Sequence, residues 1–82
     1  MKELSDSVRA VEACLFAAEE PLGVDDIAAY VGSGVDVKAA LAELEAHYAG
    51  RGIELVGRGR RWHFQSAAGL AHILRRARRG GR

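Results

Sequence analysis

Three arginines beside a tryptophan are the residues of this chain best suited to chemistry. Arg58, Arg60 and Arg61 lie in the stretch GRGRRW, and Trp62 follows them directly. Arginines this close together can neutralise several phosphates, which gives strongly salt-dependent nucleic-acid binding without sequence preference. Alternatively they are solvated residues of a turn, or they contact acidic protein groups, where an exposed ion pair contributes about 0–1 kcal/mol. We expect Trp62 to be a core residue, since a base-stacking surface usually needs several exposed aromatic side chains.

Other reactive side chains are few and show no catalytic pattern. Cys14 lies among apolar residues, where we expect a small buried hydrophobe and not a nucleophile. The acid pairs at 19–20 and 25–26 flank a turn and a helix start, which is typical of capping and solvation. Three histidines have no ligand-like spacing: His47, His63 and His72. We therefore predict no enzyme, no metal site and no cofactor.

Charge is divided unevenly along the 82 residues. All eleven acids lie between Glu3 and Glu54 with only four basic residues, a net charge of −7. From Arg58 to the end there are eight arginines and no acid. Such asymmetry indicates nucleic-acid contact, a basic tail, or two copies or partners that meet acidic surface to basic surface.

Length and composition favour one globular domain. Residues of the AVILMFWYC class make up 49% of the chain, which is too many for a disordered segment. No apolar run is long enough to cross a bilayer, and the N-terminus lacks the apolar core of a secretory signal. We expect a cytoplasmic protein with no membrane partner.

The hydrophobic period predicts three helices in the first 50 residues. The segment 5–20 has an apolar stripe of helical spacing, with Ser5 as N-cap and Pro21 as the stop signal. The segment 23–32 is a short helix from Gly23 to Gly32, and its predicted apolar side consists of Ile27, Tyr30 and Val31. The segment 36–50 begins at Asp36, and its predicted buried stripe consists of Val37, Leu41, Leu44 and Tyr48.

After Gly52 apolar and polar residues alternate with a period of two, which predicts two strands of a β-hairpin. The tip of this hairpin is predicted at 57–61, with glycines at the positive-φ positions. The segment 67–79 is helical in pattern again, with Leu70, Ile73 and Leu74 on one side. The predicted class is α+β, mostly helical: a winged helix-turn-helix of three helices, a two-stranded wing and a C-terminal helix. We assign residues 1–74 to this domain. Residues 75–82 are a basic tail or the start of a linker to a second winged-helix domain.

The third helix shows whether the domain could recognise a DNA sequence, because in a DNA-binding helix-turn-helix the exposed side of this helix enters the major groove. That side is alanine-rich and slightly acidic, with almost no groups that read bases: Ala39, Ala42, Glu43 and Ala46. It suits close protein packing better than base recognition. We therefore favour a protein-interaction module, with a DNA-binding protein that uses its wing and tail as the alternative.

Two phrases resemble the family of segregation and condensation protein B, ScpB. The phrase CLFAAEEPL at 14–22, followed by DDIA at 25–28, is similar to the opening of its members. GIEL at 52–55 and WHFQS at 62–66 are similar to a later hairpin phrase, although family members usually have threonine after the aromatic strand. The resemblance covers residues 8 to 74 and matches the N-terminal domain of a family that has two winged-helix domains.

This resemblance implies a non-enzymatic subunit of the bacterial SMC–kleisin complex in chromosome condensation and segregation, associated with the nucleoid. Its partners would be a second copy, the kleisin subunit and the SMC ATPase. Candidate interface residues are Ala13, Phe16, Ala39, Ala42, Glu43 and Ala46. Candidate contacts to phosphates or a partner, including weak non-specific DNA binding, are Arg58, Arg60, Arg61, Arg75, Arg76, Arg78 and Arg79.

Overall fold

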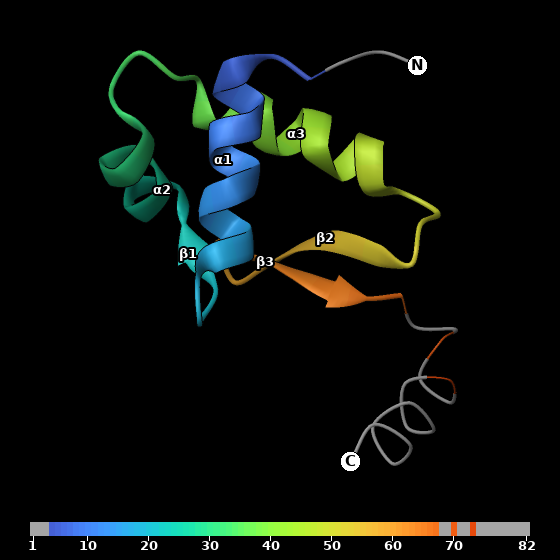
Figure 1. The fold of residues 1–82 in the computed structure, drawn as a ribbon. Coiled ribbons are helices and arrows are strands. Elements are labelled where there is room, and N and C mark those ends of the chain that lie inside the picture. The colour runs from blue at the N-terminus through green and yellow to red at the C-terminus, as the bar shows by residue number, and fades with distance from the viewer. Residues whose placement is uncertain (1–3, 68–69, 71–72, 74–82) are drawn as a thin grey trace.

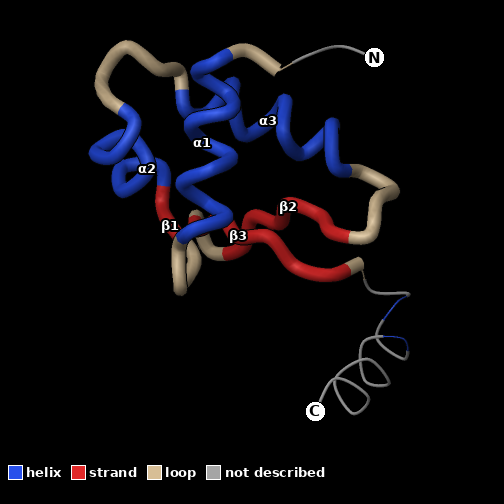
Figure 2. Tube along the Cα trace, in the orientation of Figure 1, coloured by secondary structure: helices blue, strands red, loops and turns tan. Residues whose placement is uncertain are grey.

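The computed structural model describes residues 4–67, 70 and 73. In this part of the chain the elements follow the order α1 (Asp6–Ala17), β1 (Leu22–Gly23), α2 (Val24–Val31), α3 (Val37–Tyr48), β2 (Ile53–Arg58) and β3 (Arg61–Ser66). Figure 1 shows α1 crossing in front of α3, with α2 beside them and the hairpin of β2 and β3 below. Figure 2 shows the same view coloured by secondary structure, with the helices together on one side of the sheet. The predicted winged-helix class is confirmed.

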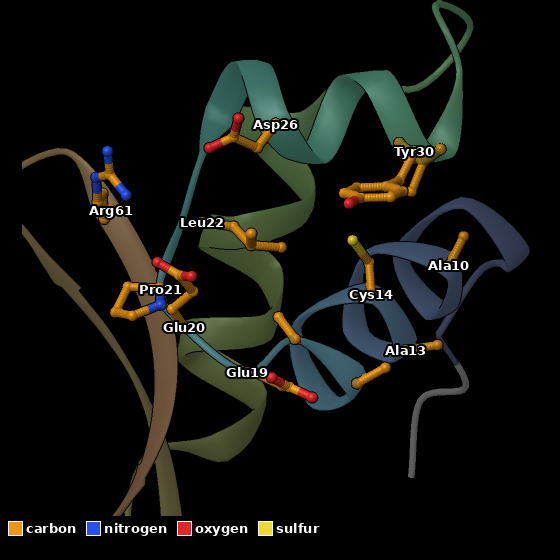
Figure 3. A pocket seen from close by; sticks show the side chains of 13 residues that line it. Ala10, Ala13, Cys14, Glu19, Glu20, Pro21, Leu22, Asp26, Tyr30 and Arg61 are labelled. Atoms are coloured by element: carbon orange, nitrogen blue, oxygen red, sulfur yellow. The ribbon is translucent and has the colours of Figure 1, made fainter.

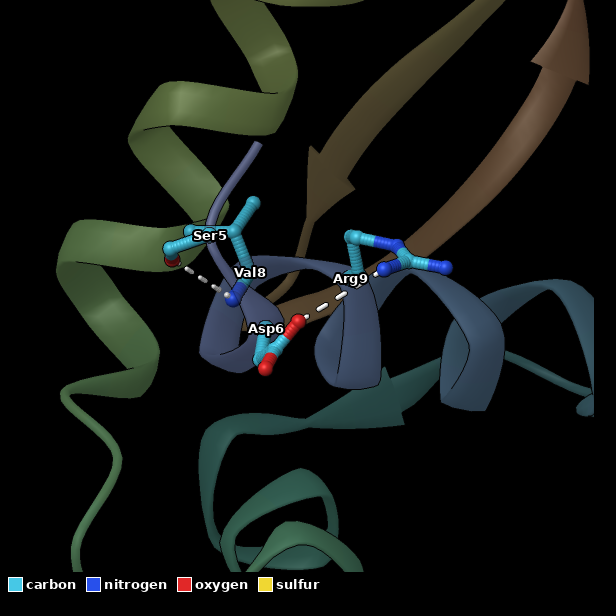
Figure 4. A network of polar contacts seen from close by, with 4 residues as sticks. All are labelled: Ser5, Asp6, Val8 and Arg9. Atoms are coloured by element: carbon cyan, nitrogen blue, oxygen red, sulfur yellow. Dashed lines mark hydrogen bonds and ion pairs between the residues drawn. The ribbon is translucent and has the colours of Figure 1, made fainter. Parts of the chain in front are cut away.

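Helix α1 begins where the sequence places its cap. The hydroxyl of Ser5 accepts a hydrogen bond from the Val8 N–H at 3.3 Å, which satisfies one free donor of the first turn (Figure 4). Asp6 lies near the positive end of the helix dipole and forms an exposed ion pair with Arg9 at 3.5 Å. The helix ends at Ala17, earlier than the predicted stop before Pro21, because Ala18 is already extended as the chain turns toward β1.

Helices α2 and α3 are also capped as predicted. The N–H of Gly23 donates to Oδ2 of Asp26 at 3.0 Å, and Gly32 ends α2 with φ at 99°. At the start of α3, Oδ1 of Asp36 accepts from the Ala39 N–H at 3.1 Å. These hydrogen bonds between residues three positions apart fix where each of the two helices of the helix-turn-helix begins.

The core lies between the helices and the inner face of the sheet. Its fully buried large side chains are Ile27, Leu41, Leu44 and Val11. Trp62 and Phe64 are half-buried and pack against this cluster, in agreement with the predicted core role of Trp62. Tyr30 was predicted on the buried side of α2, but it is 75% exposed. The eight-residue helix packs through Ile27, and Tyr30 points away from the core.

The sheet has three antiparallel strands in the order β1-β3-β2, so the predicted two-stranded wing is incomplete. The short β1 adds to the other edge of β3, with Leu22 opposite Trp62. In the hairpin, Arg58 pairs with Arg61, and the turn between them consists of Gly59 and Arg60 with φ of 59° and 68°. Two positive φ values are typical of a type I′ turn. The prediction that glycines take both positions is wrong for the second one, which is Arg60.

The predicted C-terminal helix lies outside the described residues, as do the boundary at residue 74 and the basic segment 75–82. Leu70 is described, and its Cδ1 lies 3.8 Å from the point that a Cβ on Gly52 would occupy. The N–H of Ala67 also donates to the Gly52 carbonyl at 2.9 Å. The chain therefore leaves the sheet beside the start of β2.

Candidate protein-interaction surface

An exposed aromatic ring marks the face of α1 that points away from the core. Phe16 is 79% exposed, although the preceding Leu15 is buried. Near it on the sheet, Ile53 at the start of β2 is 41% exposed. Phe16 is one of the candidate interface residues of the sequence analysis, and the structure places its side chain outward.

Helices α1 and α3 and strands β2 and β3 bring further apolar side chains beside this ring. We call this surface the Phe16 patch, and its members are Ala13, Phe16, Tyr48, Ile53 and Phe64, which line one hollow of about 300 Å³. Tyr48 and Phe64 pack edge to face with ring centroids 5.0 Å apart, so the base of the hollow is fixed. Arg9 and Glu12 also line the hollow. An apolar centre with charged side chains around it is typical of protein interfaces.

The outer face of α3 is smooth, as the sequence predicts. Ala39, Ala42 and Ala46 are exposed, and Glu43 is half-buried. Ala42 shares a second hollow with Lys38 and Glu45 of α3 and with the wing residue Arg60. The mixed charges and small side chains of this face offer no arginine, asparagine or glutamine to base edges, so it suits protein contact better than groove reading.

The wing arginines Arg58, Arg60 and Arg61 are all exposed. In the described residues the only ion pair joins Arg9 to Asp6, so no acid pairs with the wing there. Arg58 and Arg61 lie directly opposite each other in the hairpin, an arrangement in which like charges repel. The remaining candidates, Arg75, Arg76, Arg78 and Arg79, lie outside the described residues.

A groove between α1 and α2 is the feature that sequence reasoning missed. We call it the α1–α2 groove, and Figure 3 shows the side chains that line it. Its volume is about 990 Å³. Small residues of α1, together with Ala18 just after it, form the base of the groove: Ala10, Ala13, Cys14, Ala17 and Ala18. The spacing of these small residues along one face was the sequence feature that could have indicated a groove. The position of α2 opposite that face cannot be predicted from the hydrophobic period of α1.

Cys14 lies in this groove and is half-buried, whereas the sequence predicted a buried residue. Burial raises the pKa of its thiol above the ordinary value of 9.0. The thiolate is therefore disfavoured at neutral pH, which is the opposite of what an activated nucleophile needs.

Neither a metal-binding cluster nor a membrane-spanning helix occurs among the described residues. Among them no group of three or more histidine, cysteine, aspartate or glutamate side chains could hold a metal ion. In the same part of the chain, no helix has the length and apolar character needed to span a membrane.

Comparison with solved structures gives three informative relatives. The crystal structure of ScpB from Mycobacterium tuberculosis is 25% identical with a TM-score of 0.83, and the match covers 98% of this chain but 53% of that one. The chain therefore spans about half the length of that relative. A dimer of the ScpB N-terminal domain complexed with a ScpA peptide is 32% identical with a TM-score of 0.76, and the match covers 93% of this chain and 92% of that one.

The third relative, a conserved hypothetical protein from Chlorobium tepidum, is 23% identical with a TM-score of 0.68 over 85% of this chain and 46% of that one, and it shares the fold. Comparison with curated proteins gave no match. A family model described as segregation and condensation complex subunit ScpB matches residues 9–81, nearly the whole sequence. The chain therefore belongs to the ScpB family of segregation and condensation complex subunits.

Proposed function

We propose that this chain is a non-enzymatic subunit of the bacterial SMC–kleisin complex, acting in chromosome condensation and segregation in the cytoplasm. In this proposal the domain mediates self-association. Membership of the ScpB family supports the assignment, as does the similarity to an ScpB N-terminal domain that forms a dimer with a bound ScpA peptide. By the same similarity, we propose that a kleisin segment binds the dimer and connects it to the SMC ATPase.

The observation that carries the proposal is the 79% exposure of Phe16 at the centre of an apolar patch. Burying a phenylalanine side chain contributes about 1.5–3 kcal/mol, so one such ring per copy favours association. In a dimer with twofold symmetry the same patch is used by both copies, and each Phe16 finds the hollow beside the other. The fixed Tyr48 and Phe64 rings reduce the ordering cost of that contact.

The alanine face of α3 is the second apolar contact surface in this proposal. Because Ala39, Ala42 and Ala46 are small and exposed, a partner helix can approach the α3 backbone closely. Charge at the edge of this face, from Lys38 and Glu45, would set the orientation of the partner more than its affinity.

Replacement of Phe16 by glutamate tests the proposal. A charge at the centre of a dimer contact must be desolvated, so we expect Phe16→Glu to convert the dimer to a monomer in sedimentation velocity. Ala29→Glu is the matched control, because Ala29 is exposed on α2 and belongs to neither surface. Dissociation constants that are equal for Phe16→Glu, Ala29→Glu and the unmodified chain would refute the Phe16 patch as the interface.

Non-specific binding to duplex DNA through the wing is the second candidate function. It is favoured by the three exposed arginines at the tip of the hairpin, which have no acidic partner among the described residues. Such contacts would go to phosphates, because the outer face of α3 carries almost no base-reading groups.

A further inference from the structure

Two hollows meet at the exposed ring of Phe16. The hollow of the Phe16 patch contains Arg9, whereas a neighbouring hollow of about 410 Å³ contains Glu19 and Glu20. Three apolar residues line both hollows, so the apolar surface continues from one to the other: Phe16, Ile53 and Phe64. This surface therefore has a guanidinium on one side of the Phe16 ring and two carboxylates on the other.

These charged groups are weakly paired within the single copy. The side chain of Arg9 is 68% exposed and pairs with Asp6, an exposed ion pair of a kind that contributes about 0–1 kcal/mol. The acids at 19–20 are exposed and form no ion pair among the described residues. By contrast, the carboxylate of Glu12 already accepts the hydrogen bond of the Tyr48 hydroxyl. A partner can therefore pair with Arg9 and with the acids at 19–20 at little cost to the fold.

The order of these residues along α1 limits how two copies can pair. Arg9, Ala13 and Phe16 are exposed and are spaced by four and three residues, so they share one face of the helix. The helix ends at Ala17, and Figure 3 shows the acids at 19–20 just beyond that end. The outer side of α1 therefore carries, in chain order, a cation, a small residue, an aromatic ring and two carboxylates.

A twofold axis can relate two α1 helices in a parallel or an antiparallel way. In a parallel pair each residue faces the same residue of the other copy, which would place Arg9 against Arg9 and the acids at 19–20 against each other. In an antiparallel pair centred between Ala13 and Phe16, the Phe16 ring of one copy faces the small Ala13 of the other and enters the hollow of its Phe16 patch. Arg9 then lies beside the acids of the other copy, so the antiparallel arrangement alone matches opposite charges.

We propose that self-association pairs the α1 helices of two copies in antiparallel orientation, with Arg9 of each copy bound to Glu19 or Glu20 of the other. This inference rests on the proposed self-association and specifies its orientation and its charged contacts. Twofold symmetry repeats the ion pair, once on each side of the two Phe16 rings. These charges select the orientation more than they add affinity, because like charges placed together at an interface cost more than exposed ion pairs contribute.

Charge reversal tests this orientation. The basic residue is reversed in Arg9→Glu, and the acidic pair is reversed in a variant with Glu19→Lys and Glu20→Lys. Each variant alone creates two like-charge contacts in the antiparallel dimer, so we expect its dissociation constant in sedimentation equilibrium to rise roughly tenfold. Arg58→Glu is the matched control for net charge, because Arg58 is exposed at the opposite end of β2 from Ile53. This control should dimerise as tightly as the unmodified chain.

A combined variant with all three substitutions decides between the two orientations. In an antiparallel dimer the reversed residue 9 again faces opposite charges at 19–20, so we expect the dissociation constant to return close to that of the unmodified chain. In a parallel dimer each position faces itself, so every variant would dimerise about as tightly as the unmodified chain. Separate reversals that leave the dissociation constant unchanged would overturn the proposal, as would a combined variant as weak as either of them.

Zero-length cross-linking gives an independent readout of the same contact. Arg9→Lys keeps the charge, and a carbodiimide joins the introduced amine to a carboxylate that touches it. Within one copy, eight residue steps of α1, about 12 Å, already separate residue 9 from the end of the helix. In a mixture of isotope-labelled and unlabelled chains, we expect mass spectrometry to find mixed-isotope links between residue 9 and residues 19–20. A dimer that forms without these links would overturn the proposal.

Failure of the orientation is distinct from failure of the proposed function. If the unmodified chain dimerises, and Phe16→Glu disrupts the dimer while the charge variants do not, the self-association stands and the antiparallel pairing is wrong. If the unmodified chain is a monomer at every concentration, the self-association and the pairing fail together.

Discussion

The hydroxyl of Tyr48 donates a hydrogen bond to the Oε2 atom of Glu12 and thereby joins α3 to α1 across 36 residues of sequence. The ring of Tyr48 also packs edge-on against Phe64 of β3. The Tyr48 side chain, itself a member of the Phe16 patch, therefore connects both long helices and the sheet. The shape of that patch depends on this connection, because Glu12, Tyr48 and Phe64 all line its hollow.

Removing the hydroxyl should weaken the fold without changing its shape. We expect Tyr48→Phe to lower the free energy of unfolding in urea by about 1 kcal/mol, the net value of a typical side-chain hydrogen bond. Tyr30→Phe is the matched control, because the Tyr30 side chain is exposed. If both variants unfold at the same urea concentration, the bond to Glu12 contributes nothing to stability.

The same bond makes stability depend on alkaline pH. The hydrogen bond to Glu12 raises the pKa of Tyr48 above its ordinary value of 10.0; partial burial and the charge of Glu12 act in the same direction, and Arg51 opposes them. The folded state therefore holds the phenol proton more tightly than the unfolded chain. The resulting stability is fully present below pH 10 and is lost as the pH rises through the higher folded pKa.

Unfolding of the unmodified chain and of Tyr48→Phe in urea at pH values on both sides of 10 checks this dependence. We expect the unmodified chain to lose more of its unfolding free energy than the variant as the pH rises. Parallel curves for the two proteins would show that another group causes the alkaline loss.

Gly57 is needed because the indole ring of Trp62 covers it. The two residues are opposite each other in the hairpin, and a Cβ on Gly57 would lie 2.9–3.0 Å from three atoms of that ring. We expect Gly57→Ala to displace Trp62 and to cost about 1–3 kcal/mol, as overpacking does. In Gly34→Ala the new methyl group meets open space, so this control should remain near the unmodified stability in thermal unfolding. Equal melting temperatures for the two variants would contradict the contact.

The wing arginines can be tested separately from assembly. We expect Arg58→Ala, Arg60→Ala and Arg61→Ala together to leave the dimer intact and to abolish affinity for duplex DNA in fluorescence anisotropy. Phosphate contacts also predict a steep loss of that affinity with salt in the unmodified chain, with a log–log slope of about −0.9 per contact. Duplex binding that persists unchanged in the triple variant would exclude the wing.

Local features of this fold were predictable, because their causes are local. Ser5 and Asp36 act as caps through hydrogen bonds to residues three positions away. The period of α3 correctly indicated the burial of Leu41 and Leu44. The period of the hairpin predicted Trp62 as a core residue, and Trp62 packs against the core but is half-buried. By contrast, β1 has two residues, too few to show a period, and it exists only because β3 offers a free edge.

The interaction surfaces were less predictable, since they depend on how elements are placed relative to one another. The period of α1 separates Phe16 from the buried stripe, but only the packed structure shows that no described element covers it. Tyr30 was assigned to the core of α2 by the same kind of pattern and proved exposed. The α1–α2 groove requires two helices at a set separation, which no single segment encodes.

Self-association is the central claim, and sedimentation equilibrium of the unmodified chain over a concentration series tests it most directly. The account predicts a dimer in the micromolar range. A chain that sediments as a monomer well above that range would contradict it.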